Sequence, residues 1–168
     1  TAWNETLLRL GANFRGSWNQ GHAYRLVTAN YLHANLIHLL SNIGALASFG
    51  LLVEKLLGPT RMITIYGVST LAGAFASSFT DSLAVGASTG VFGLMAATLF
   101  VQTRHGNRLP NTVRIDRNSW IVLVAVNGAL PLVIPNISWA GHAGGALAGL
   151  LVSGLVAAAP TSIDGRPA

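Results

Sequence analysis

The chain has 168 residues, a length typical of a single domain. Charged residues make up 9% and hydrophobic residues 51%, whereas an ordinary soluble domain has roughly 25% charged residues. This composition argues against a soluble domain and indicates a membrane protein with several helices. The net charge is +5, but no basic run alternates with aromatic residues, so nucleic-acid binding is not expected. The absence of cysteine excludes disulfides and thiolate metal sites.

Residues 1–35 are mixed in polarity and are expected to form an outer loop segment ahead of the membrane helices. Residues 36–159 then form the transmembrane core, and residues 160–168 a C-terminal tail. Five apolar segments in the core are near the roughly 20 residues that a bilayer requires. They run from Leu36 to Leu57, Met62 to Phe79, Leu83 to Val101, Ser119 to Ile134 and Ile137 to Ala159. The expected fold class is all-α, a polytopic transmembrane helix bundle.

Charges in the loops predict the orientation of this bundle. With five spans, six cations fall at the side where the second and fourth spans begin: Lys55, Arg61, Arg104, Arg108, Arg114 and Arg117. Because short cytoplasmic loops are enriched in Lys and Arg, that side is expected to face the cytoplasm. Residues 1–35 then lie outside, although Arg9, Arg15 and Arg25 within them oppose the assignment.

Four polar residues stand near the start of three spans. His38 and Asn42 are four residues apart and share one helix face. Ser88 lies within Gly86-Ala87-Ser88-Thr89-Gly90, and His142 opens the fifth span. Polar residues inside a membrane are costly and indicate function by default. Since these spans alternate in direction with the others, all four residues are expected at similar depth on the outer side.

This set of side chains fits covalent catalysis by a serine. A hydroxyl becomes a good nucleophile when a base takes its proton, so Ser88 is the candidate nucleophile and His142 its base. His38, Asn42 and the backbone N–H groups around Ser88 are candidate donors to an oxyanion. Gly86 and Gly90 have no side chain, so the backbone of neighbouring segments is able to approach the nucleophile closely. Taken singly, a serine in a membrane helix usually only bonds to a neighbour, so the argument rests on the joint placement.

Small residues predict how the last span packs. Gly141, Gly145 and Gly149 form two overlapping GxxxG steps, which allow close approach of a second helix. We expect that second helix to be the one that carries Ser88.

The spacing Gly86-x-Ser88-x-Gly90 also matches the nucleophile elbow of α/β-hydrolases, with Asp116 and His142 in the matching order. That elbow follows a strand of a soluble sheet, whereas membrane spans flank Ser88 here. Asp116 is also expected on the opposite side of the membrane. We therefore reject this interpretation.

Five motifs, in order and over nearly the whole chain, together resemble the rhomboid family. They are Tyr24-Arg25, the spacing of His33, His38 and Asn42, Gly50 to Gly58 with Glu54 between, Gly86-Ala87-Ser88 followed by Val91-Phe92-Gly93-Leu94, and His142-Ala143-Gly144-Gly145 running on to Gly149.

The resemblance implies an intramembrane serine endopeptidase with a Ser88–His142 dyad and no acidic third member. It implies that His38, Asn42 and the Ser88 N–H stabilise the oxyanion, and that residues 1–35 dip into the membrane. Arg25 and His33 would give structural support. The substrates would be membrane-anchored proteins, cut in or near their transmembrane segments. No metal or organic cofactor is expected. The expected location is the bacterial inner (plasma) membrane, with the active site open to the outer side.

Three features depart from the family pattern. Thr89 stands where the family commonly has glycine, and Tyr24 where it has tryptophan. The family core has six helices and this chain five, so a sixth is expected to precede Thr1. Thr89 motivates an alternative, a catalytically silent relative that binds transmembrane clients. A small transporter or channel ranks last, since the inner halves of the spans are apolar apart from Ser and Thr.

Overall fold

The computed structural model of the chain describes residues 1–81, 83–133 and 137–156. The expected C-terminal tail at 160–168 lies outside these residues, as do the expected ends of the last two spans at Ile134 and Ala159. Within the described residues the regular elements are helices, apart from one isolated antiparallel bridge between Asn13 and Ala84. The all-α fold class is therefore confirmed.

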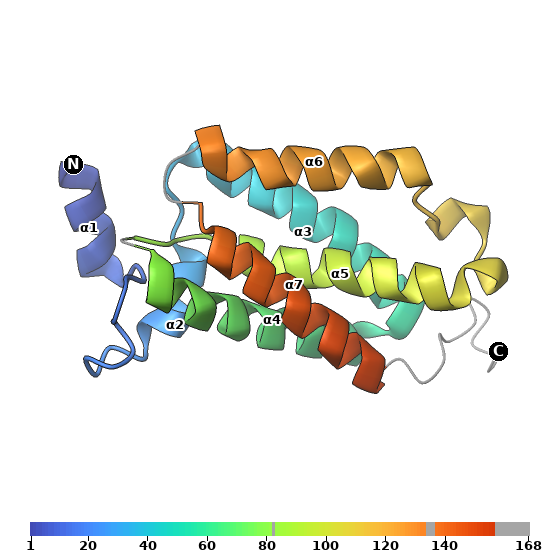
Figure 1. Cartoon of the computed structure of the whole chain (residues 1–168), viewed down its shortest axis with the longest axis horizontal. Helices are drawn as coiled ribbons and strands as arrows, with labels where there is room; N and C mark the ends of the chain where they lie inside the picture. Colours follow the sequence, from blue (N-terminus) through green and yellow to red (C-terminus); the bar gives the residue numbers. More distant parts are fainter. Residues whose placement is uncertain (82, 134–136, 157–168) are drawn as a thin grey trace.

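Five long helices form the bundle in the described part of the chain. They are α3 (Leu36–Leu57), α4 (Pro59–Thr80), α5 (Ser88–His105), α6 (Arg117–Val133) and α7 (Trp139–Val156). Helices α3, α5 and α7 begin at the same end of the molecule, and α4 and α6 run back toward it (Figure 1). This alternation brings the first turns of α3, α5 and α7 together.

Short helices and loops complete the structure at the two ends of the bundle. At the end where α5 begins lie α1 (Ala2–Leu10), α2 (Arg25–Thr28) and the 3-10 turn η1 (Ala29–Tyr31). At the other end, between α5 and α6, lie the 3-10 turns η2 (Gly106–Arg108) and η3 (Asn111–Val113). Residues 1–35 thus contain helices of their own, packed over the end where Ser88 lies.

The start of the third predicted span was wrong. The helix begins at Ser88 rather than Leu83, because the residues before it are extended and bonded elsewhere. Backbone bonds of 3.1 and 2.9 Å pair Ala84 with Asn13. Gly86 then adopts φ 114°, a left-handed conformation that L side chains rarely adopt, which reverses the chain into the helix. Ser88 is therefore the first helical residue.

Three of the helices are long and apolar enough to cross a membrane by length and hydropathy alone, among the residues described: α3, α4 and α7. α6 is shorter, at 17 residues. α5 carries polar residues at both ends and is the central helix of the bundle, with ten of its 18 residues buried. A helix enclosed by others presents little surface to lipid, so a lower hydropathy suffices there.

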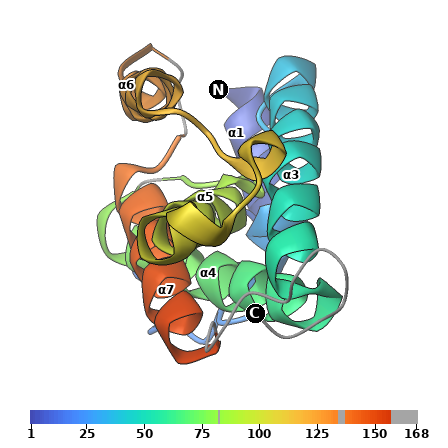
Figure 2. The ribbon, with the colours of Figure 1, turned by 90° about the vertical axis from the view of Figure 1, so that its right-hand side faces the viewer.

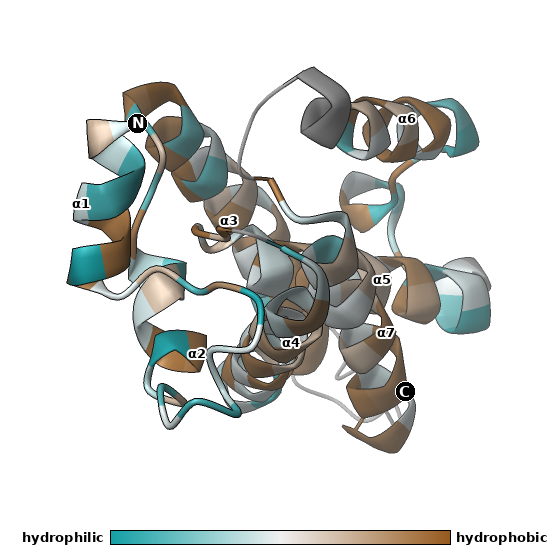
Figure 3. Ribbon diagram, turned by 60° about the vertical axis from the view of Figure 1, so that its left-hand side comes forward, coloured by the Kyte–Doolittle hydropathy of each residue, from teal (hydrophilic) through white to brown (hydrophobic). Residues whose placement is uncertain are grey.

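The outward faces of the long helices are apolar. Exposed side chains include Ile37 and Leu40 on α3, Ile63 on α4, and Leu151 and Leu155 on α7. Figure 3 shows long helices coloured mainly as hydrophobic, with more hydrophilic residues in α1 and the loop before α2. Exposed apolar surface on this scale is unfavourable in water and favourable in lipid. The chain is an integral membrane protein.

Helix α6 is set apart from its neighbours at the side of the bundle (Figure 2). Its start is tied to the end of α5, where Trp120 Nε1 donates to Gln102 Oε1 over 2.8 Å. Further along, a cavity separates it from α5 and α7. α6 is thus anchored at one end and loosely packed along its length.

The first turn of α6 is expected to depend on pH. The Asp116 carboxylate accepts bonds from the backbone N–H groups of Asn118 and Ser119 and from the Ser119 hydroxyl. The Ser119 hydroxyl and N–H lower the pKa of Asp116. A lowered carboxyl pKa stabilises the folded turn above the ordinary aspartate pKa, and this contribution is lost as pH falls through the lowered value.

An NMR titration of the Asn118 and Ser119 amide signals checks this expectation. Both signals should shift together as the pH falls through the lowered pKa, below the ordinary value for aspartate. Asp116→Asn should remove the transition. A transition at or above the ordinary aspartate pKa would contradict the hydrogen bonds that the Asp116 carboxylate accepts from Asn118 and Ser119.

Candidate active site

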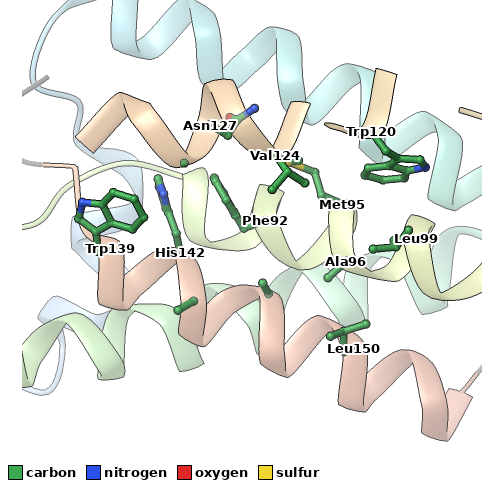
Figure 4. A pocket seen from close by; sticks show the side chains of 13 residues that line it. Phe92, Met95, Ala96, Leu99, Trp120, Val124, Asn127, Trp139, His142 and Leu150 are labelled. Carbon is green, nitrogen blue, oxygen red and sulfur yellow. The ribbon is translucent and has the colours of Figure 1, made fainter. Parts of the chain in front are cut away.

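Ser88 and His142 lie in contact at one end of the bundle. Ser88 is the first residue of α5, and His142 lies in the first turn of α7. The Ser88 Oγ is 2.8 Å from His142 Nε2, although 54 residues separate them in the chain. Phe92, one turn after Ser88, stacks on the imidazole with ring centroids 3.9 Å apart and planes 14° apart. Figure 4 shows the two rings side by side. The imidazole is thereby held with one ring nitrogen toward the hydroxyl.

A capping interaction fixes the start of α7, and with it His142. The Gly141 N–H donates to Ser138 Oγ over 2.7 Å, which satisfies one of the free donors of the first turn. The Ser138 hydroxyl in turn donates to the Asp81 carboxylate at the end of α4. His142 N–H bonds to the Ser138 carbonyl at 3.0 Å. The histidine therefore occupies a helix start that is anchored to a second helix.

Close packing of α7 against α5 brings the two residues together. A Cβ added at Gly145 would lie 2.1 Å from the carbonyl oxygen of Thr89, and one at Gly149 would lie 2.3 Å from that of Gly93. Such distances are far below van der Waals contact, so only glycine fits at both places. The predicted contact between these two helices is present, and α7 also lies against α4.

His38 and Asn42 lie beside the turn that precedes Ser88. Both are buried, at 8% and 6% exposure. A Cβ added at Gly86 would lie 2.9 Å from His38 Nε2 and 3.8 Å from Asn42 Nδ2, so both side chains border this glycine. The Ala34 N–H donates to His38 Nδ1 over 3.4 Å, and Asn42 Nδ2 donates to the His38 carbonyl over 2.8 Å. The structure thus brings four of the predicted residues to one end.

Helix capping places His38 at this position. Asn35, the N-cap of α3, accepts a bond of 2.8 Å from the His38 N–H. This fixes the first turn of α3, in which His38 is the third residue. His33 packs edge-on against the His38 ring at a centroid distance of 5.2 Å. Burial lowers the pKa of His33, with the Tyr31 backbone opposing, so its ring is neutral at pH 7.

Arg25 lies further from Ser88 and ties the N-terminal segment together. Its Nη1 donates to the carbonyls of Leu8 and Ala12, each over 2.7 Å. Its guanidinium also lies 5.2 Å from the centroids of the Phe14 and Tyr24 rings. The Leu8 carbonyl also accepts from the Gly11 N–H at the end of α1, so Arg25 adds a second bond there and joins α1 to the residues that follow it.

The side chain of Thr89 points away from Ser88 and His142. Its hydroxyl donates to Asn30 Oδ1 over 3.3 Å and lies 3.4 Å from the Thr70 carbonyl. Gly73 makes room for it, since a Cβ there would lie 2.5 Å from that of Thr89. The β-branched side chain therefore packs between α5 and α4, with its methyl group near Gly141 of α7, and it also lines the small cavity that borders Ser88. Gly90 serves the same interface, because a Cβ there would meet Thr70 Oγ1 at 2.3 Å.

Two cavities adjoin the pair. A small one of about 20 Å³ borders Ser88, and its mixed lining includes the polar residues Asn13, Asn30, Ser77 and Ser138. This volume admits one water molecule. A larger one of about 350 Å³ lies between α5, α6 and α7. His142 and Trp139 are at one end of it and Leu99 and Leu150 toward the other (Figure 4).

Several residues support the site in ways that the sequence did not predict, including Phe92, which was noted only as part of the serine motif. Phe92 lies four residues after Ser88, and this spacing already predicts that the two share a helix face. Ser138 stands just before an apolar run, which is a usual signal for an N-cap. Asp81 and Asn13 carried no such signal. Asp81 accepts a hydrogen bond from Ser138, and Asn13 donates one to the Ala74 carbonyl. Both partners are more than 50 residues away in the chain.

The fold and this site define a membrane helix bundle with a partly buried serine–histidine pair at one end. The Rhomboid domain family matches residues 20–159 of the chain. The chain therefore belongs to the rhomboid family.

Curated relatives agree with this membership. The chain is 32% identical over 150 residues to the rhomboid protease GluP of Bacillus subtilis (strain 168), covering 89% of this chain and 29% of that protein. It is 34% identical over 160 residues to RHOMBOID-like protein 7 of Arabidopsis thaliana, with coverage of 91% and 49%. It is 31% identical over 156 residues to Rhomboid-like protease 1 of Toxoplasma gondii, with coverage of 87% and 51%. The chain thus spans about half the length of these relatives, or less.

Proposed function

We propose that this chain is the core of an intramembrane serine endopeptidase that cleaves membrane-anchored proteins in or near their transmembrane segments. The observation that carries the proposal is the 2.8 Å contact between Ser88 Oγ and His142 Nε2 within a membrane helix bundle. Two of the relatives carry the word protease in their names, which supports the same class of activity.

Ser88 and His142 would act as nucleophile and general base. The Ser88 Oγ attacks the scissile carbonyl while its proton passes to His142 Nε2, and the protonated imidazole then donates that proton to the leaving amine. Water hydrolyses the acyl-enzyme, with His142 again as base. The small cavity beside Ser88 is a suitable place to hold that water. The stacked ring of Phe92 keeps the imidazole oriented throughout.

His38 and Asn42 would stabilise the oxyanion. Since His38 Nδ1 accepts a bond from the Ala34 N–H, the neutral ring carries its proton on Nε2, beside Gly86. The Asn42 amide has two hydrogens and uses one on the His38 carbonyl, which leaves the other free for a substrate. Donors of this kind are effective because they are already in place when charge develops on the carbonyl oxygen.

The larger cavity would accept apolar side chains of the substrate. It reaches His142 at one end and is lined by residues such as Phe92, Met95, Trp120 and Trp139. We also propose that α5 and α6 cross the membrane with the other three long helices, as a five-span core. Its arginine-rich end would face the cytoplasm and its Ser88 end the outer side of a bacterial inner membrane.

The alternative is a catalytically silent relative that binds transmembrane clients. Thr89 motivated it, because a β-branched residue beside the nucleophile either crowds the site or points away from it. The Thr89 side chain instead bonds toward Asn30 and Thr70. No observation in the described residues therefore favours this alternative over the protease.

Labelling with a fluorophosphonate probe tests the proposed nucleophile. We expect the purified protein to be labelled at Ser88, because a general base at hydrogen-bonding distance activates that hydroxyl. Ser88→Ala should abolish the label. Ser48→Ala is a matched control, since Ser48 is an exposed serine of α3 whose hydroxyl donates to the Gly44 carbonyl. Equal labelling of wild type and Ser88→Ala would reject Ser88 as the nucleophile. Unlabelled wild type that co-purifies with intact clients would favour the silent relative.

A further inference from the structure

A polar cavity lies at the opposite end of the bundle from Ser88. It has a volume of about 580 Å³ and is lined by Gln102, Thr103, Arg104, His105, Gly106, Arg108 and Arg114. These residues come from the last turn of α5, from η2 and from the residue after η3. Because α5 has 18 residues between the two ends, the cavity lies about 25 Å from Ser88 at 1.5 Å per residue. It shares no lining residue with the candidate active site.

Hydrogen bonds and packing hold the wall of this cavity in place. Gln102 Nε2 donates to the Val113 carbonyl over 3.0 Å, and Gln102 Oε1 accepts from Trp120. The side chains of Leu109 and Val113 are buried in the main hydrophobic core. The loop between α5 and α6 is therefore folded back onto the bundle, and this sets the position of Arg114 next to Val113.

The positive charges around the cavity are not neutralised by other described residues. Arg104, Arg108 and Arg114 form no ion pair or hydrogen bond within the described part of the chain. The nearby Asp116 uses its carboxylate on Asn118 and Ser119. His105 Nε2 is buried and has no hydrogen-bond partner among the described residues.

We propose that this cavity binds the phosphate group of an anionic phospholipid. Three guanidinium groups around one cavity match the chemistry of phosphate oxygens, which arginine binds with paired N–H donors. His105 also lines the cavity. A free phosphate ion has the same chemistry. The lipid is the favoured source because the cavity lies where the hydrophobic length of α5 ends, at the level of headgroups.

The simpler explanation is that these arginines only set membrane orientation. Cytoplasmic loops are enriched in Arg and Lys for that reason alone, and no bound ligand is then required. In that case any arginine of the loop should contribute equally to attraction by an anionic membrane. A binding site instead predicts that arginines lining the cavity matter more than one outside it.

Native mass spectrometry of the purified full chain tests the proposal. Phosphatidylglycerol or phosphatidylcholine is added, and the fraction of protein with bound lipid is measured for wild type, Arg114→Gln and Arg117→Gln. Arg117 is a matched control, because it is an exposed arginine of the same loop region that does not line the cavity. We expect Arg114→Gln to weaken phosphatidylglycerol binding about fivefold per lost arginine contact. Arg117→Gln and phosphatidylcholine binding should show no such change.

A second arginine variant and inorganic phosphate are also measured, so that the conclusion does not depend on Arg114→Gln alone. Arg108→Gln should weaken phosphatidylglycerol binding as Arg114→Gln does, and thermal unfolding checks that each variant is folded. Equal weakening by Arg114→Gln and Arg117→Gln would overturn the proposal in favour of nonspecific attraction. Inorganic phosphate is added in a final arm. If it binds without lipid as tightly as phosphatidylglycerol does, and loses binding in Arg114→Gln, the lipid as the ligand is overturned. The experiment measures lipid binding and not proteolysis. A failure of this proposal therefore leaves the proposed protease activity untouched, and the reverse also holds.

Discussion

Replacing Ser88 or His142 by alanine is expected to abolish cleavage of a transmembrane substrate in liposomes. Ser88→Ala removes the proposed attacking oxygen, and His142→Ala removes the proposed base 2.8 Å from it. In serine proteases, losing either member of such a pair lowers the rate by a factor on the order of 10⁴ to 10⁶. Since the two residues act as one unit, the double variant should be no slower than either single variant.

Matched variants separate chemistry from folding in this experiment. Ser48→Ala, at an exposed position in the middle of α3, and His22→Ala, in the loop before α2, remove the same side chains away from the site. Both should retain cleavage. Product accumulation is followed by gel electrophoresis, with thermal unfolding of each variant as the check on structure. Cleavage by Ser88→Ala at the wild-type rate would remove the basis of the proposed mechanism.

A single methyl group at Gly145 or Gly149 is expected to inactivate the protein by separating α7 from α5. The added Cβ would lie 2.1 Å from the carbonyl oxygen of Thr89, or 2.3 Å from that of Gly93. Backbone atoms cannot turn aside as a flexible side chain does, so the helices must move apart. Overpacking of this kind costs about 1–3 kcal/mol of stability. A misplacement of the order of 1 Å between reacting groups lowers the rate by roughly 10²-fold.

Gly154→Ala is the matched control for this prediction. Gly154 is on the same helix, but the nearest atom to an added Cβ is Phe100 Cζ at 3.9 Å, an ordinary contact. This variant should keep its activity and be at least as stable as wild type, because alanine favours a helix over glycine by roughly 0.5–1 kcal/mol. Thermal unfolding and substrate cleavage are measured for all three variants. Equal behaviour of Gly145→Ala and Gly154→Ala would contradict the proposed role of close packing.

Hydrophobicity predicted most of the helices because it is a local property of the chain. The first predicted span, Leu36 to Leu57, coincides with α3. The failure at Leu83 shows the limit of this signal. Residues 83–85 are apolar like a helix, but Leu83 and Val85 pack against Leu7 and Ala12 from the N-terminal segment, and Ala84 pairs with Asn13. A distant partner thus decided their conformation, and no local pattern reveals it.

The order and spacing of the apolar segments were enough to predict which residues gather at one end of the molecule. Alternating helix directions require His38, Ser88 and His142 to lie at the same end, whatever the details of packing. Tertiary structure decided how they meet. The distance between Ser88 and His142 depends on how closely α7 approaches α5, and the harmless position of Thr89 depends on the space left by Gly73. These are contacts between residues far apart in the chain, whose geometry follows from the packing of whole helices rather than from any one segment.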